Sequence, residues 1–123
     1  MKNNPVAWFE IHVQDLQRAK AFYEQVFQTR LVNLGDETME YWTFPGDMQT
    51  SGAAGALVKE DAVRPGGNSV TVYFSCEDCA VEAGRAQAAG GHLREAKMPI
   101  GEHGFISLVS DSEGNLIGLH SMR

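Results

Sequence analysis

The sequence lacks the features of several protein classes. It has no run of about 18 apolar residues, which a membrane-spanning helix needs, and its first segment, MKNNPVAWFE, lacks the apolar stretch of a signal peptide. Basic residues are few, with 10 Lys plus Arg against 16 Asp plus Glu, so neither nucleic acid nor an anionic membrane is expected as a partner. No Ser-His-Asp order, phosphate loop or dinucleotide fingerprint is present. We therefore expect a cytoplasmic protein outside these classes.

The chain has the size and composition of a single globular domain. It holds 123 residues, of which 43% are hydrophobic and 21% charged. A chain of this length buries roughly two-thirds of the surface that it exposes when unfolded. We therefore expect one domain over residues 1–123.

Only two cysteines occur, Cys76 and Cys79, and they form a C-x-x-C motif between a predicted strand and a predicted helix. Such a pair can be redox-active, because the N-terminus of a helix lowers the pKa of a thiol. A zinc site is less favoured, since no second Cys or His pair follows at a suitable spacing. The alternative is structural: Cys76 ends a strand on its core-facing side and Cys79 opens a helix as a small apolar residue.

The first half of the chain predicts a strand, a helix and three more strands. Residues 6–14 alternate between apolar and polar, and Asp15 is a good N-cap for the helix LQRAKAFYEQVF, whose apolar residues recur at helical spacing. The segments TRLVNLG and MEYWTF predict a hairpin, PGDMQTSG a loop, and AAGALVK a fourth strand.

The second half repeats this order at an offset of 63 residues. SVTVYFSCEDC predicts a strand, AVEAGRAQAAGG a helix, and HLREAKM, FISLVSD and LIGLHSM three further strands. Asp15 superposes on Asp78, and Trp8, Glu10 and His12 fall on Thr71, Tyr73 and Ser75. A unit of about 60 residues is marginal alone. The sequence therefore predicts an α+β fold in which two β-α-β-β-β modules, about 5–60 and 68–123, form one curved mixed sheet, a cup with the helices on its outer face.

The strand at 7–15, AWFEIHVQD, carries Trp8, Glu10 and His12 on the face opposite to its core residues. A carboxylate inside the cup needs a partner, so we expect Glu10 to meet His12, His120, Tyr73, water or a ligand. One interpretation is a pocket for a small organic ligand, in which Glu10, His12 and His120 supply polar groups and Trp8, Tyr73 and Phe105 form apolar walls. Alternatives are acid–base catalysis by Glu10 and His12, a metal site of Glu10, His12 and His120, and a hydrated sheet or a subunit contact.

Three segments of this sequence resemble the vicinal oxygen chelate superfamily, which contains glyoxalase I, bleomycin resistance proteins and extradiol dioxygenases. They are VQDLQRAKAFYEQVF, AAGGHLREAKMPIGEHGF and SDSEGNLIGL. The resemblance implies a cup-shaped fold, a small organic molecule as partner and a homodimer. It implies no single activity, because this fold carries lyases, dioxygenases, transferases and binding proteins.

The resemblance also implies that the usual metal site of the family is absent. Its metal enzymes place one ligand seven residues before the helix-capping aspartate, which is Trp8 here, and the matching position in the second module is Thr71. The ligand of the last strand falls on Gly118, and the fourth strand, AAGALV, offers no His, Glu or Gln.

Three hypotheses follow, and whether the chain is an enzyme stays open. The first is a binding protein that uses no cofactor, with Trp8, Glu10, His12, Thr71, Tyr73, Phe105 and His120 lining its ligand site. The second is a glyoxalase-like lyase or dioxygenase that uses a shifted site for zinc, nickel, manganese or iron, or that uses Glu10 and His12 as acid and base. The third is an interaction module whose cup is closed by a second subunit.

Overall fold

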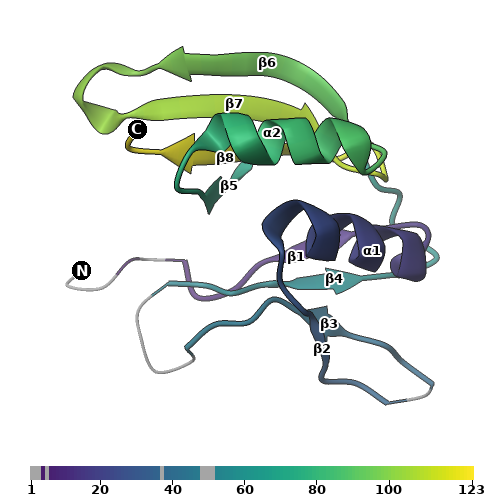
Figure 1. Cartoon of the computed structure of the whole chain (residues 1–123). Helices are drawn as coiled ribbons and strands as arrows, with labels where there is room; N and C mark the ends of the chain where they lie inside the picture. The colour runs from purple at the N-terminus through teal and green to yellow at the C-terminus, as the bar shows by residue number, and fades with distance from the viewer. Residues whose placement is uncertain (1–3, 5, 37, 48–51) are drawn as a thin grey trace.

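The computed structural model of the chain describes residues 4, 6–36, 38–47 and 52–123 (Figure 1). Residue 5, where the first module is predicted to begin, and residues 48–51 of the predicted loop lie outside this part. The helices and strands within it are β1 Glu10–His12, α1 Leu16–Phe27, β2 Val32–Asn33, β3 Trp42–Thr43, β4 Ala56–Val58, β5 Val72–Ser75, α2 Cys79–Ala88, β6 His92–Pro99, the short 3-10 helix Gly101–His103, β7 Phe105–Ser110 and β8 Leu116–Ser121.

The described strands pair into two four-stranded mixed sheets, one from each half of the chain. Their orders, β1-β4-β3-β2 and β5-β8-β7-β6, are equivalent. Each sheet has one parallel pair, at one of its edges: β1 with β4 in the first sheet and β5 with β8 in the second. The remaining pairs are antiparallel. The predicted α+β fold of two β-α-β-β-β units is thereby confirmed, with two mixed sheets of four strands in place of one continuous sheet. The two sheets are consistent with a curved cup. The strand predicted over 6–14 is shorter in the structure, because β1 pairs with β4 only from Glu10↔Ala56 to His12↔Val58.

Both helices begin at the aspartates that the repeat aligns. Asp15 accepts a hydrogen bond from the backbone N–H of Arg18 at 3.0 Å, and Asp78 accepts one from that of Ala80 at 3.1 Å. Each carboxylate thus satisfies a backbone donor that the first helical turn would leave unpaired. Neither described helix is long and apolar enough to cross a membrane.

An aromatic cluster joins the two halves in the core. The ring of Phe74, on β5, lies 4.6 Å from that of Phe27 on α1, and 5.4 Å from that of Phe44 beside β3. Helix α1 buries the apolar stripe that its spacing predicts, and Figure 1 shows it lying between the first sheet and α2. The stripe consists of Leu16, Ala19, Phe22, Tyr23 and Val26. Because Phe74 comes from the second sheet and its neighbours from the first half, this cluster fixes how the two units pack.

Replacing Phe74 by alanine should lower the free energy of unfolding by about 3 kcal/mol, since it removes a ring from the joint between the two halves. Urea denaturation followed by far-ultraviolet circular dichroism measures this change. Val70→Ala is the control: Val70 is 69% exposed, so its truncation should change stability by less than about 0.5 kcal/mol. Equal, small effects of both substitutions would show that the aromatic cluster does not hold the halves together.

Candidate functional site

Strand β1 places its polar residues on the face that the helices leave uncovered. Ile11 and Val13 are 7% and 1% exposed and belong to the hydrophobic core. Successive side chains of a strand point to opposite sides, so Glu10 and His12 lie on the other face. Glu10 is exposed and His12 is half-buried there. The alternation read from the sequence is therefore the one that the strand adopts.

Glu10 finds a partner that sequence reasoning missed. The hydroxyl of Tyr41 donates a hydrogen bond to Glu10 Oε2 at 2.8 Å, and the indole Nε1–H of Trp8 donates to the same Tyr41 oxygen at 2.8 Å. Partial burial raises the pKa of Tyr41, and the hydrogen bond to Glu10 raises it further, so the phenol stays protonated as the donor. This chain of two hydrogen bonds orients one carboxylate oxygen of Glu10 and leaves the other available.

His12 lies against a second carboxylate, that of Glu60. The distance between His12 Nε2 and Glu60 Oε2 is 2.5 Å. One donor atom from each of Glu10, His12 and Glu60 can be chosen so that all three lie within 4.8 Å of one another. His120, which the sequence suggested as the third member, is placed elsewhere: its Nε2 lies 2.7 Å from the backbone oxygen of His103.

The pairing of β1 with β4 explains how Glu60 reaches His12. β4 pairs with β1 in parallel, with His12 opposite Val58, and Glu60 lies two residues further along the same segment. A period of two along an extended chain returns Glu60 to the side of Val58. The sequence alone does not show that β1 and β4 are neighbouring strands.

A cavity of about 320 Å³ lies beside this strand. Glu10 and His12 line it, together with the segment between β4 and β5 and the first residues of β8. Its apolar wall consists of Phe9, Ile11, Val63, Pro65, Val70, Val72, Leu116 and Ile117, and its remaining lining residues are Arg64, Gly66, Asn68 and Asn115. The cavity therefore combines a mostly apolar surface with few polar groups.

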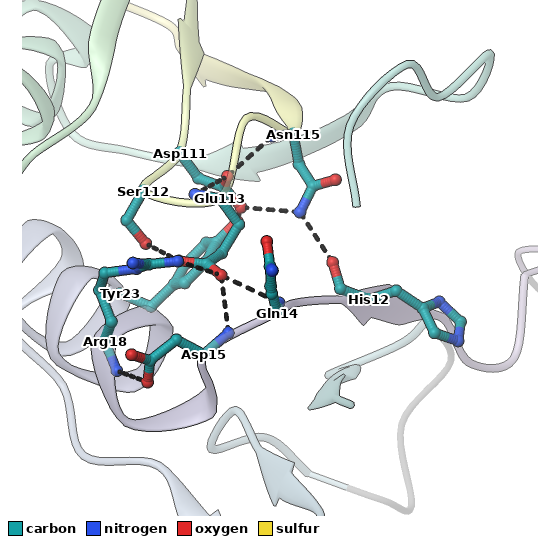
Figure 2. A network of polar contacts seen from close by, with 9 residues as sticks. All are labelled: His12, Gln14, Asp15, Arg18, Tyr23, Asp111, Ser112, Glu113 and Asn115. Atoms are coloured by element: carbon teal, nitrogen blue, oxygen red, sulfur yellow. Dashed lines mark hydrogen bonds and ion pairs between the residues drawn. The ribbon is translucent and has the colours of Figure 1, made fainter. Parts of the chain in front are cut away.

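The turn between β7 and β8 holds the end of β1 in place (Figure 2). The side chain of Glu113 is fully buried, and its Oε1 accepts hydrogen bonds from the backbone N–H groups of Gln14 and Asp15, each at 2.9 Å. Arg18 adds an ion pair, with its Nε 2.6 Å from Glu113 Oε2. Burial opposes the ionisation of Glu113, but the hydrogen bonds from Arg18, Asp15 and Gln14 outweigh it and hold its pKa below the ordinary 4.5.

Asn115, in the same turn, connects β1 to the wall of the cavity. Its Nδ2 donates to the backbone oxygen of His12 at 3.0 Å, and its Oδ1 accepts from the backbone N–H of Gly66 at 2.6 Å. Asp111 orients the amide of Asn115 and also accepts a hydrogen bond from the Tyr23 hydroxyl at 2.7 Å. Figure 2 shows the imidazole of His12 pointing away from this network, which thus fixes the backbone of β1 without using its functional side chains.

The aromatic residues predicted for the second half of the site lie apart from this cavity lining. Tyr73 is 49% exposed on β5 and covers Gly118 of β8, so that a side chain at position 118 would overlap its ring. Phe105 is on the face opposite to the predicted one: it packs against the hydrophobic core, and Lys97 Nζ lies 4.7 Å from its ring centre. Its strand, FISLVS, has apolar residues on both faces, so the sequence pattern could not decide which face is buried.

The three positions at which the resemblance places metal ligands hold other kinds of residue. The indole of Trp8 donates to Tyr41, and the ring of Tyr73 occupies the space above Gly118. Thr71 is half-buried just before β5. A hydroxyl is therefore the one side-chain oxygen that these positions offer.

The cysteines behave as core residues in this structure. Cys79 is fully buried at the start of α2, and burial, followed by the nearby Glu82, raises the pKa of the Cys76 thiol to about 12. A protonated thiol is a poor nucleophile, which favours the structural interpretation of the C-x-x-C motif over the redox one.

Comparison with known proteins gives a family and a set of similar folds. The family model described as Glyoxalase/Bleomycin resistance protein/Dioxygenase superfamily matches residues 6–119. A search of curated proteins finds no significant relative. Among solved structures, a glyoxalase I mutant from Zea mays has 19% identity and a TM-score of 0.77, with 96% of this chain and 46% of that chain covered.

Two further structures are similar over almost their whole length. A glyoxalase/bleomycin resistance protein/dioxygenase family enzyme from Burkholderia phytofirmans PsJN has 18% identity and a TM-score of 0.72, with 95% and 98% of the two chains covered. TnmS3, an antibiotic binding protein from Streptomyces sp. CB03234, has 23% identity and a TM-score of 0.68, with 98% of each chain covered. At these identities the similarity shows the fold alone.

The ionised form of Glu113 should stabilise the fold in a pH-dependent way. Because its folded-state pKa is lowered, the stabilisation is present above the unfolded value of about 4.5 and is lost as the pH falls through the folded-state pKa. Glu113→Gln should therefore cost about 2 kcal/mol at pH 7 and progressively less below pH 4.5, measured by urea unfolding across pH. Glu77→Gln, at an exposed position, is the matched control and should cost little at any pH. A cost for Glu113→Gln that does not depend on pH would contradict this role.

Proposed function

The chain belongs to the Glyoxalase/Bleomycin resistance protein/Dioxygenase superfamily, and we propose that it binds a small organic molecule in the cavity beside β1. The observation that carries this proposal is the cavity itself: about 320 Å³, mostly apolar, with Glu10 and His12 at one wall. Ligand sites in proteins combine this kind of apolar surface with a small number of oriented polar groups.

The polar groups define what such a ligand needs. Glu10 presents a carboxylate oxygen that its hydrogen bond to Tyr41 does not use, and this oxygen accepts a hydrogen bond or faces a cation. Arg64 also lines the cavity and supplies guanidinium donors, whereas the side chain of Asn68 is bonded to the backbone of Val70 and Leu116. The best ligand is therefore a largely apolar molecule that carries both a donor group for Glu10 and an acceptor group for Arg64.

Two further observations support a binding role. The fold is similar to that of TnmS3, which is described as an antibiotic binding protein. The positions that carry metal ligands in the metal enzymes of the family hold Trp8, Thr71 and Gly118 here, so ligand binding in this cavity would not use the family's usual metal. The homodimer and the cytoplasmic location implied by the sequence remain predictions, which sedimentation analysis and cell fractionation check.

A bulky residue in the cavity should abolish ligand binding. Saturation-transfer NMR with a panel of small aromatic and alkyl amines, alcohols and acids identifies a ligand. When this ligand is added, the chemical shifts of the protein amides should change most around four residues, Glu10, His12, Val70 and Leu116. Val70→Trp should then weaken binding at least about tenfold, because the indole fills the cavity.

Val81→Trp is the matched control, since Val81 is 48% exposed on α2 and does not line the cavity. It should leave the affinity unchanged. Shifts centred on the exposed face of β5 and β8, or equal losses from the two tryptophan substitutions, would rule out the cavity as the ligand site.

Catalysis of the lyase or dioxygenase kind is the second candidate function. The contact of 2.5 Å between His12 and Glu60, at the edge of the cavity, favours it, because a carboxylate beside an imidazole is a common arrangement for general acid–base chemistry. If a cavity ligand is consumed, Glu60→Gln should lower the turnover rate by about 100-fold, measured with saturating ligand. An unchanged rate would exclude the pair of His12 and Glu60 from the chemistry.

A further inference from the structure

The side chains of Glu10, His12 and Glu60 bring together three groups that can bind a metal ion. Each offers one ligand atom, and these atoms lie within 4.8 Å of one another. Two atoms that are each about 2.1 Å from an ion are at most about 4.2 Å apart, so shifts of exposed side-chain ends suffice to reach this geometry. Glu60, whose side chain is 59% exposed, has room for such a shift.

The fold holds the backbone of His12 and one carboxylate oxygen of Glu10 before any ion binds. Glu10 and His12 are alternate residues of one strand, and the network around Asn115 holds the backbone oxygen of His12. The hydroxyl of Tyr41, itself bonded to Trp8, holds one oxygen of Glu10. Hydrogen bonds of this kind orient the ligands in known metal sites and raise their affinity.

The local charge also favours a cation. Two carboxylates lie around one imidazole, and among the described residues their hydrogen bonds and ion pairs involve only the neutral Tyr41 and His12 itself. The neighbouring Lys59 is 3.2 Å from Asp61, and so has a carboxylate partner outside the group. A divalent ion would neutralise the two negative charges and replace the direct contact between His12 and Glu60.

We propose that Glu10, His12 and Glu60 form a binding site for a divalent transition-metal ion such as Zn²⁺, Mn²⁺ or Co²⁺. One imidazole nitrogen and two carboxylate oxygens suit these ions. The site is distinct from the positions of Trp8, Thr71 and Gly118. Because Glu10 and His12 also line the cavity, coordination positions that the protein leaves open face the space available to a small molecule. The site does not depend on the organic ligand proposed above.

Metal binding to the purified, chelator-treated protein tests this proposal without any organic ligand. Titration with Zn²⁺ in a calorimeter should give one ion per chain, and Co²⁺ should give visible absorption bands of a protein-bound ion. Glu60→Gln should weaken Zn²⁺ binding at least about 100-fold. Tyr41→Phe, which removes the hydroxyl that bonds to Glu10 and to Trp8, should weaken it about 10-fold. Circular dichroism confirms that each variant is folded.

The chain supplies a matched control for non-specific surface binding. Glu102 and His103 form another carboxylate–imidazole pair, 3.9 Å apart, with side chains that are 90% and 77% exposed. Removing that pair by Glu102→Gln and His103→Ala should leave the affinity unchanged. Binding that survives Glu60→Gln, or that falls equally in the control, would overturn the proposal, as would the absence of stoichiometric binding in the unmodified protein.

Discussion

Two buried carboxylates in the turn between β7 and β8 are the constraint on which the rest of the structure depends. Glu113 accepts hydrogen bonds from the backbone just after β1, and Asp111 accepts one from Tyr23 in the middle of α1. The side chain of Glu113 is fully buried and Asp111 is 2% exposed, so the loss of a partner would leave buried polar atoms without a hydrogen bond. The second half of the chain thereby fixes the position of the first strand and the first helix, and with them the polar face of β1.

This constraint separates the support of the site from its chemistry. The network uses the backbone of His12, Gln14 and Asp15, and it leaves the imidazole of His12 and the carboxylate of Glu10 free to meet other groups. A superfamily that hosts several activities on one fold needs such a division, because the residues on the strand can change while the scaffold stays. In this chain the positions at which the resemblance places metal ligands hold an indole, a hydroxyl and a glycine, and β1 contributes Glu10 and His12 to a carboxylate–imidazole–carboxylate group with Glu60.

The cavity and the group of Glu10, His12 and Glu60 share one wall, and this gives the two proposals a common geometry. An ion bound by these three residues would lie at the edge of a mostly apolar space, where it could contact a polar end of a bound molecule. The organic ligand proposed for the same space would need Glu10 and Arg64 but no ion. The two proposed binding events thus differ in their determinants even though both involve β1.

The sequence by itself determined the features that depend on neighbours along the chain. The N-caps Asp15 and Asp78, the buried stripe of α1 and the repeat of two β-α-β-β-β units are encoded in local spacing, so they could be predicted, and with them the α+β class. Contacts across the sheets were decided only by the tertiary structure. The parallel pairing of β1 with β4 brings Glu60 to His12, and it is the fold that places His120 against the His103 carbonyl and Phe105 against the hydrophobic core. The physical reason is that strand register and the choice of buried face arise from packing between segments that are separated along the chain, by 48 residues for His12 and Glu60 and by 17 for His120 and His103. No local pattern specifies them.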